Sequence, residues 1–369
     1  MKDKNPYIEL GVSPIVSAGG TWTRLGGSRP DNDVLTSMQL ANDDFCDLNE
    51  LLIKSGEAIA DLVGCEAAHI SSGGFAALVI AVAGIISKGD PEIITKLPDS
   101  QNIPNEFLMP KLTRFRYDRS VSVAGGKLIE SGTSDCTTIE DMKRSLTENT
   151  VGIFYLARME DDEGMPFLPE TVEFAKENKL SLLVDGGGEV FPLERMKTLV
   201  STGADLISFG TKYFGGFNST GLLCGTKEMI GYAKLNGFMG FEVDDSNSLG
   251  RGYKVDRQEV IGTWTALKKW FSIDHEERLG AQKEKLNYVA ERLKDIPSIT
   301  TSIAEGANLS LVIHISNDAR STASEIFDNF TQERKIWVGV APDQISVAGY
   351  SLREGEGEIV ADALLDMLA

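Results

Sequence analysis

The chain has 369 residues, 42% hydrophobic and 25% charged, a composition that supports a sizeable buried core. Its formal net charge of −19 argues against nucleic-acid binding, because that binding depends on clustered lysine and arginine. No apolar run approaches the roughly eighteen residues of a membrane span, and no apolar leader core follows Met1, so we expect a cytoplasmic protein with no membrane partner.

From about residue 51 to 235 the hydrophobic pattern alternates between helical and strand segments. Leu51–Val63 and the almost wholly apolar Phe75–Ser87 predict helices, and Thr137-x-x-Glu140 and Pro169 indicate the starts of two more. The predicted strands are Ala67–Ser71, Glu92–Leu97, Gly126–Glu130, Val151–Ala157, Leu180–Val184 and Asp205–Ser208. This alternation predicts an α/β fold with a mostly parallel central sheet, whose ligands bind at the carboxyl ends of the strands.

After about residue 256 the pattern changes to α+β and predicts a smaller second domain. The expected elements are one long helix or two in series over Val260–Leu293, strands over Ser298–Ser302, Leu309–Ile315 and Gln344–Ala348, and helices over Ala323–Phe330 and Glu358–Leu368. We therefore expect a large α/β domain over residues 46–255 and a linking helix with a small α+β domain over 256–369. Residues 1–45 are rich in turn residues and are expected to pack on the small domain or on a partner subunit.

Two predicted strands end in polar residues of opposite charge. Leu182-Leu-Val-Asp185 ends in a carboxylate, and Asp205-Leu-Ile-Ser-Phe-Gly-Thr-Lys212 ends in a lysine, each followed by glycines. A pyridoxal 5'-phosphate (PLP) enzyme needs this pair, because a lysine holds the cofactor as a Schiff base and a carboxylate keeps the pyridine nitrogen protonated. The alternatives are a surface lysine at Lys212 and a helix cap at Asp185. The glycines after Asp185 make a poor helix start, so the catalytic interpretation is favoured.

A third segment, Ser71-Ser-Gly-Gly-Phe75, joins a strand to the buried helix. Backbone N–H groups at a helix start, glycines and hydroxyls are the features of a phosphate anchor, so Ser72, Gly73 and Gly74 are candidate cofactor ligands. The segment matches neither a Walker loop nor GxGxxG, and many turns of this kind are merely Gly/Ser-rich. Ser208 and Thr211 are candidates for further hydroxyl contacts.

Candidates for substrate binding are arginines, since a planar guanidinium binds a carboxylate in bidentate fashion. Arg24, in a glycine-rich setting, and Arg257, before the long helix, are the two we select, with ordinary surface charges as the alternative. His69 and His314 lie in strand patterns and no metal site is expected. The four cysteines form no CxxC pair and are expected to be reduced thiols.

These segments together resemble a known family. The matching stretches are Ser17–Gly27, Gly64–Gly74, Pro98–Glu106, Val184–Glu189, Gly210–Gly216 and Leu352–Glu356. They are similar to the selenocysteine-synthase-like group of fold-type-I (aspartate aminotransferase-like) PLP enzymes, and within it to the D-glucosaminate-6-phosphate ammonia-lyase type. The chain departs from this pattern at Gly186-Gly187, where Ala-Ala is usual, and at Phe209, where a serine is expected.

The resemblance implies roles for individual residues. Lys212 would form the Schiff base, Asp185 would pair with the pyridinium, and Ser72, Gly73 and Gly74 would bind the cofactor phosphate. No histidine is available to stack on the ring, which leaves Gln101 or Asn102 for that role. The resemblance also implies a homodimer or larger homo-oligomer with active sites shared between subunits.

The function expected from both lines of reasoning is a PLP-dependent lyase. It would release ammonia by α,β-elimination from an amino acid or amino sugar acid, such as phosphorylated D-glucosaminate, and leave a 2-keto acid. The same quinonoid chemistry also serves an amino-acid racemase, an epimerase or an aldolase, so these stay open as alternatives. A non-catalytic protein with a PLP-enzyme fold is a third hypothesis, against which the intact Asp185 and Lys212 pair argues.

Overall fold

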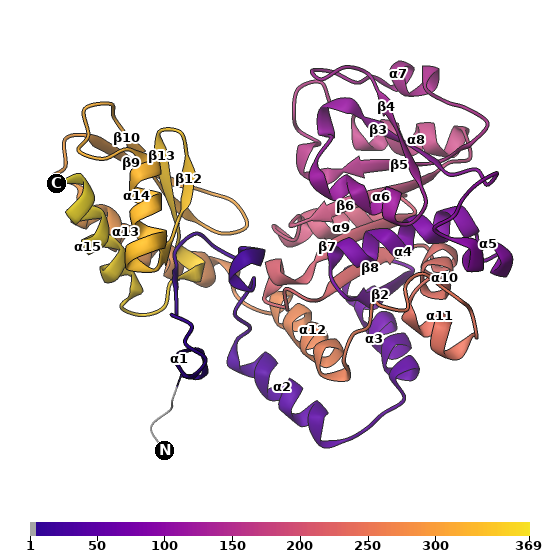
Figure 1. Ribbon diagram of the computed structural model, residues 1–369, viewed down its shortest axis with the longest axis horizontal. Helices are drawn as coiled ribbons and strands as arrows, with labels where there is room; N and C mark the ends of the chain where they lie inside the picture. Colours follow the sequence, from indigo (N-terminus) through magenta and orange to yellow (C-terminus); the bar gives the residue numbers. More distant parts are fainter. Residues whose placement is uncertain (1–4) are drawn as a thin grey trace. The chain divides into compact units, whose positions relative to one another are not determined.

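A computed structural model describes residues 5–369 (Figure 1), and the described chain forms two compact units. One unit comprises Arg29–Phe271, and the other combines the chain up to Ser28 with Ser272–Ala369. Their limits do not coincide with the predicted domain limits at 45/46 and 255/256, which stay predictions. Within residues 5–369 no helix is both long enough and apolar enough to cross a membrane.

The larger unit is built on a seven-stranded sheet in the order β2-β8-β7-β6-β5-β3-β4. Its strands are β2 (Ala67–Ser71), β3 (Glu106–Pro110), β4 (Lys127–Ser131), β5 (Thr150–Leu156), β6 (Ser181–Gly187), β7 (Leu206–Gly210) and β8 (Gly221–Gly225). The neighbours from β7 to β4 pair in parallel, whereas β8 is antiparallel to both β7 and β2. The mostly parallel sheet is therefore confirmed. The sequence analysis missed β3 and β8, two short strands of five residues each.

Helices cover both faces of this sheet (Figure 1). They are α2 (Asn32–Asp43), α3 (Leu48–Val63), α4 (Gly74–Ser87), α5 (Pro91–Lys96), α6 (Arg119–Val123), α7 (Ile139–Arg144), α8 (Leu168–Glu177), α9 (Leu193–Ser201), α10 (Lys227–Leu235), α11 (Phe238–Val243) and α12 (Arg257–Trp270). The helix α4 packs with α6 and α10 on one face, and α3, α8 and α9 belong to the other. From Ala76 to Ser87 every residue of α4 is buried, as its apolar composition predicts, against side chains such as Phe107, Phe154 and Leu183.

Two predictions for local structure are wrong, and one helix was not predicted. The segment predicted as the strand Glu92–Leu97 is the helix α5, because Asp90 caps it by accepting hydrogen bonds from the backbone of Glu92 and Ile93, and Pro91 stands in its first turn. The capping box before α7 is formed by Thr138 and Asp141, one position later than predicted. Residues 1–45 contain the twelve-residue helix α2, in addition to the expected turns.

The smaller unit contains a four-stranded antiparallel sheet in the order β12-β13-β10-β9. Its elements are α1 (Pro6–Glu9), β1 (Val16–Ser17), α13 (His275–Leu293), β9 (Ile299–Ala304), β10 (Ser310–Ile315), α14 (Ala323–Asn329), β11 (Ile336–Trp337), β12 (Gly339–Ala341), β13 (Gln344–Ala348) and α15 (Glu356–Leu368). A core of Leu286, Ile313, Val347 and Leu364 joins the sheet to α13 and α15. The segment predicted as one or two helices is two, α12 and α13, in different units.

Short turns of 3-10 helix connect many of these elements. They are Thr23–Leu25, Lys111–Thr113, Arg116–Asp118, Ala157–Met159, Thr211–Phe214 and Gly349–Ser351, and a π-helical turn spans Phe330–Arg334. Three of these turns lie at the carboxyl edge of the large sheet because they directly follow its parallel strands. They are Lys111–Thr113 after β3, Ala157–Met159 after β5 and Thr211–Phe214 after β7.

Candidate active site

Strand register brings the predicted cofactor segments to one edge of the large sheet. Ser71, at the end of β2, pairs with Gly221, which in turn pairs with Gly210 at the end of β7. Asp185 of β6 pairs with Ser208 of β7. The glycine-rich turn, the aspartate and the lysine segment therefore meet at the carboxyl edge, where ligands of open α/β sheets bind.

The turn between β2 and α4 has the geometry of an anion anchor. Gly73 adopts a left-handed φ of 93°, which glycine accepts without strain, and no side chain caps α4 within the described chain. The first N–H groups of a helix have no intrahelical acceptor, so this fourteen-residue helix presents donors and a positive dipole end. The backbone of β8 approaches so closely that a Cβ on Gly221 would lie 2.3 Å from the carbonyl carbon of Gly73.

Two serines extend this turn. Ser72 is partly buried within it, and the buried Ser208 donates a hydrogen bond of 3.4 Å from Oγ to the Gly74 carbonyl. This contact ties β7, which leads to Lys212, to the start of α4. The predicted phosphate ligands Ser72, Gly73, Gly74 and Ser208 are thus adjacent in space, and their role as ligands stays a prediction.

Asp185 lies in the neighbouring strand β6, two residues before its end at Gly187. Its Oδ1 accepts a hydrogen bond of 3.0 Å from the backbone N–H of Gly187. Burial raises the pKa of Asp185 to about 6, and this hydrogen bond and the positive charge of Arg158 offset only part of the effect. A carboxylate in this position is costly without a cationic partner, so a protonated ring nitrogen fits here.

Lys212 is the second residue of the turn Thr211–Phe214, which follows β7. Burial lowers the pKa of its amine, and Nζ lies 5.1 Å from the centre of the Tyr213 ring. Its neighbour Thr211 is fully buried, and its hydroxyl lies within hydrogen-bonding distance of Phe217 O and of both oxygens of Thr220. Thr211 therefore braces the loop that carries the lysine, and this geometry does not favour its predicted contact with the cofactor.

The structure corrects the predictions for Gln101 and Arg257. Gln101 is exposed in the loop that precedes β3, at the amino edge of the parallel strands and opposite Asp185. Arg257 donates from Nε to the carbonyls of Ala41 and Asp44, and its guanidinium lies 4.7 Å from the centre of the Phe45 ring. Arg257 thus binds carbonyls at the end of α2 through Nε and, at 3.5 Å from Asn42 O, through Nη2, which is a structural role.

Arg24 is exposed and belongs to the smaller unit. Its guanidinium carbon lies 5.0 Å from the centre of the Trp337 ring, and Trp22 meets the same ring edge-on at 6.1 Å. The Trp337 Nε1–H is buried and has no hydrogen-bond partner within residues 5–369. Arg24 thus lies against the ring of a tryptophan whose buried N–H has no partner in the described chain, and substrate binding by Arg24 stays a prediction.

Sequence reasoning missed two charged residues of the carboxyl edge. Arg158 directly follows β5, the strand beside Asp185, and Arg195 of α9 forms ion pairs with Glu160 at 2.7 Å and Glu189 at 3.1 Å. The rule that selected Asp185, a polar residue at the end of an apolar strand, also selects Arg158. No comparable signal exists for Arg195, because its partners come from two separate loops.

An anion anchor, a buried carboxylate and a desolvated lysine are the three features that a PLP site requires, so the residues fit this cofactor. No group of three or more His, Cys, Asp or Glu side chains that could bind a metal ion occurs in the described residues. His69 is buried in β2, where desolvation lowers its pKa to about 3, in keeping with the core position predicted for it. The fold and the site together define a PLP-dependent enzyme of fold type I.

Comparison with known proteins agrees with this class. The model of the L-seryl-tRNA selenium transferase family matches residues 44–296, and the chain belongs to this family. Its cofactor is accordingly pyridoxal 5'-phosphate. The expected fold class and enzyme class are thereby confirmed.

Among relatives of known function, two are similar over most of their length. A D-glucosaminate-6-phosphate ammonia lyase from Salmonella typhimurium strain 14028s is 27% identical over 307 residues, covering 82% of this chain and 78% of that protein. A 5'-C-glycyluridine monooxygenase-decarboxylase from a Streptomyces species is 26% identical over 307 residues, covering 81% of this chain and 73% of that protein.

Solved structures share the whole fold. A D-glucosaminate-6-phosphate ammonia-lyase superposes with a TM-score of 0.85 at 22% identity, covering 100% of this chain and 98% of that chain. Fold-type-I enzymes such as aspartate aminotransferase are also among the similar structures. At these identities the likeness concerns the fold, and the reaction has to be argued from the site.

Proposed function

We propose that this protein is a PLP-dependent lyase that eliminates a β-hydroxyl from an amino acid or amino sugar acid and releases ammonia and a 2-keto acid. The observation that carries the proposal is the pair of opposite perturbations at one sheet edge, a carboxyl group with a raised pKa at Asp185 and an amine with a lowered pKa at Lys212. D-Glucosaminate 6-phosphate is the first candidate substrate, because a relative and a structural neighbour are named for it.

The bound cofactor supplies an electron-accepting ring that stabilises negative charge on the substrate's α-carbon. The chain's residues supply the rest. The start of α4 and Ser208 would hold the phosphate, and Asp185 as a carboxylate would hold the proton on the ring nitrogen. Lys212 would anchor the ring and, because burial favours its neutral amine, could accept the proton from the α-carbon.

The substrate anion and the subunit arrangement belong to the same proposal. Arg24, with the unpartnered Trp337 Nε1 beside it, is proposed to bind a carboxylate or phosphate of the substrate. A homodimer or larger assembly with shared active sites is supported by large exposed apolar side chains around α2, where Leu40 is 65% and Phe45 92% exposed. The proposed cytoplasmic location is supported by the four cysteines, all of them free thiols.

The decisive experiment incubates the cofactor-loaded protein with D-glucosaminate 6-phosphate, with unphosphorylated D-glucosaminate, and with free serine and threonine of both configurations. Ammonia and 2-keto acid are measured in parallel, and Lys212→Ala is the control. Equal release of both products from at least one substrate is the expected result. A change of configuration at the α-carbon without ammonia would instead identify a racemase or epimerase and overturn the proposal.

A further inference from the structure

Arg158 is an exposed arginine beside the central carboxylate of the site. It stands in the turn Ala157–Met159 directly after β5, and the preceding residue pair in the sheet is Leu156 of β5 with Asp185 of β6. Its positive charge lowers the pKa of Asp185, so the two charges lie within electrostatic reach of each other. Arg158 therefore belongs to the immediate surroundings of the proposed cofactor ring.

One aromatic side chain from the loop after β3, Phe115, contacts this guanidinium. The Arg158 guanidinium carbon lies 5.9 Å from the centre of the Phe115 ring, within the range of a cation–π contact. Phe115 in turn meets the Tyr117 ring edge-on at 5.7 Å. Within residues 5–369 the guanidinium makes no hydrogen bond beside this aromatic contact, so its N–H groups stay available.

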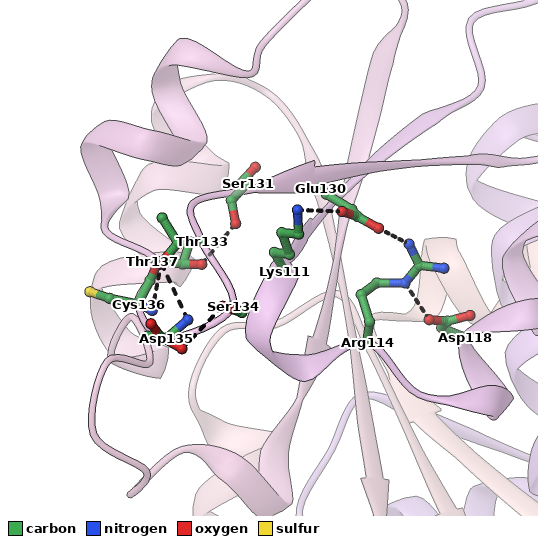
Figure 2. A network of polar contacts seen from close by, with 10 residues as sticks. All are labelled: Lys111, Arg114, Asp118, Glu130, Ser131, Thr133, Ser134, Asp135, Cys136 and Thr137. Atoms are coloured by element: carbon green, nitrogen blue, oxygen red, sulfur yellow. Dashed lines mark hydrogen bonds and ion pairs between the residues drawn. The ribbon is translucent and has the colours of Figure 1, made fainter.

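Three cations near Arg158 are paired with carboxylates, namely Lys111, Arg114 and Arg195. A fourth, Arg116, lies over the Tyr117 ring, with 5.8 Å between its guanidinium carbon and the ring centre. Figure 2 shows that Arg114 binds Asp118 and Glu130, and that Lys111 also approaches Glu130, with 3.5 Å between its Nζ and Oε2. Arg195, whose Nη2 donates to the Ala157 carbonyl next to Arg158, is paired with Glu160 and Glu189. Within residues 5–369 Arg158 forms no such ion pair, which sets it apart from these three paired cations.

We propose that Arg158 binds the α-carboxylate of the substrate. This inference rests on the proposed function, and it adds a specificity residue that selects amino acids over amines. The α-carboxylate is attached to the reacting carbon, so it must lie close to the ring that Asp185 and Lys212 hold. A phosphate at the far end of an amino sugar acid has no such constraint. A planar guanidinium with free N–H groups matches a carboxylate in bidentate geometry.

The test compares acids with matched amines that lack the carboxylate. Dissociation constants are measured from the visible absorbance of the cofactor-loaded protein for D-glucosaminate 6-phosphate against D-glucosamine 6-phosphate, and for D-serine against ethanolamine. The variants are Arg158→Gln and Arg158→Lys. The matched control is Arg119→Gln, which removes an exposed arginine of α6 from the same region. Borohydride labelling of Lys212 first establishes that each protein carries the cofactor.

Arg158→Gln should weaken binding of the acid roughly 10- to 100-fold, the loss typical of hydrogen bonds to a charged group, and leave the amine unchanged. Arg158→Lys should recover only part of the loss, and Arg119→Gln should match the wild-type protein. The inference is overturned if acid and amine weaken equally, if cofactor affinity falls instead, or if the wild-type protein does not prefer either acid. Absence of label on Lys212 in the wild-type protein would refute the proposed function itself, whereas labelled protein with unchanged preference refutes only this inference.

Discussion

Asp185→Asn should make the cofactor-free protein more stable and the loaded enzyme nearly inactive. Asparagine has almost the same shape, and its oxygen can still accept the hydrogen bond from the Gly187 backbone. It cannot ionise, however, so it removes the cost of placing a charge in this desolvated position. Stability and activity are thus expected to change in opposite directions on one substitution.

The size of the gain follows from the pKa of Asp185, which burial raises from 3.8 to about 6. A shift of about two units corresponds to about 3 kcal/mol of preference for the protonated form. The folded protein holds this proton more tightly than the unfolded chain, so its stability falls as the pH rises from about 4 to about 6. Above about pH 6 the folded protein bears the full free-energy cost of ionising the desolvated Asp185. Because Asp185 keeps some contact with solvent, about 3 kcal/mol is an upper bound.

Urea unfolding of the two cofactor-free proteins measures this difference. We expect Asp185→Asn to be more stable by up to about 3 kcal/mol above pH 7, and by about half as much near pH 5. With the cofactor bound, turnover should fall by about two orders of magnitude or more, as when a central electrostatic group is lost. An asparagine variant that is equally or less stable above pH 7, or whose advantage does not shrink in acid, would refute the reasoning.

Three further predictions concern the rest of the site. Borohydride should fix the pyridoxyl label on the peptide that contains Lys212, and a label on another lysine would disprove that assignment. Gly221→Ala should lower cofactor affinity at least about tenfold and cost roughly 1–3 kcal/mol in urea unfolding, since its Cβ meets backbone at 2.3 Å. Gly231→Ala, in open space within α10, is the control and should stabilise by up to about 1 kcal/mol. Arg24→Ala should raise KM strongly and Arg24→Lys should restore it only partly, whereas unchanged kinetics would mark Arg24 as a surface charge.

The parts of the site that could be predicted from the sequence are those that follow from strand ends. An apolar run followed by a polar residue identifies a strand and the residue at its carboxyl end. This signal indicates both Asp185 and Lys212. The turn Ser71–Phe75 was recognisable because phosphate binding uses backbone groups and therefore depends on glycine and on a helix start. Each of these signals is local in the chain.

The errors arise where a role depends on long-range contacts. The charge of Arg257 predicts substrate binding, but its Nε donates to carbonyls more than two hundred positions earlier in the chain. The position of Gln101 depends on β3, a strand that the sequence analysis missed. Because Gln101 lies in the loop before β3, it is at the amino edge of the parallel strands. The strand predicted over Glu92–Leu97 shows that a short apolar run is ambiguous, and the Asp90-Pro91 start signal decides for the helix.

The two perturbed groups also explain why the cofactor and this fold depend on each other. Burial moves Asp185 toward its neutral acid and Lys212 toward its neutral amine, so each is held away from the charge it would carry in water. A ligand with a protonated ring nitrogen restores the ionised form of Asp185 and recovers the desolvation cost as binding energy. The cofactor should therefore bind the wild-type protein more tightly than it binds Asp185→Asn. It should also raise the free energy of unfolding of the wild-type protein by more, because it binds only the folded state. The desolvated carboxyl group of Asp185 should therefore contribute to cofactor affinity, and the same group would make the bound ring reactive.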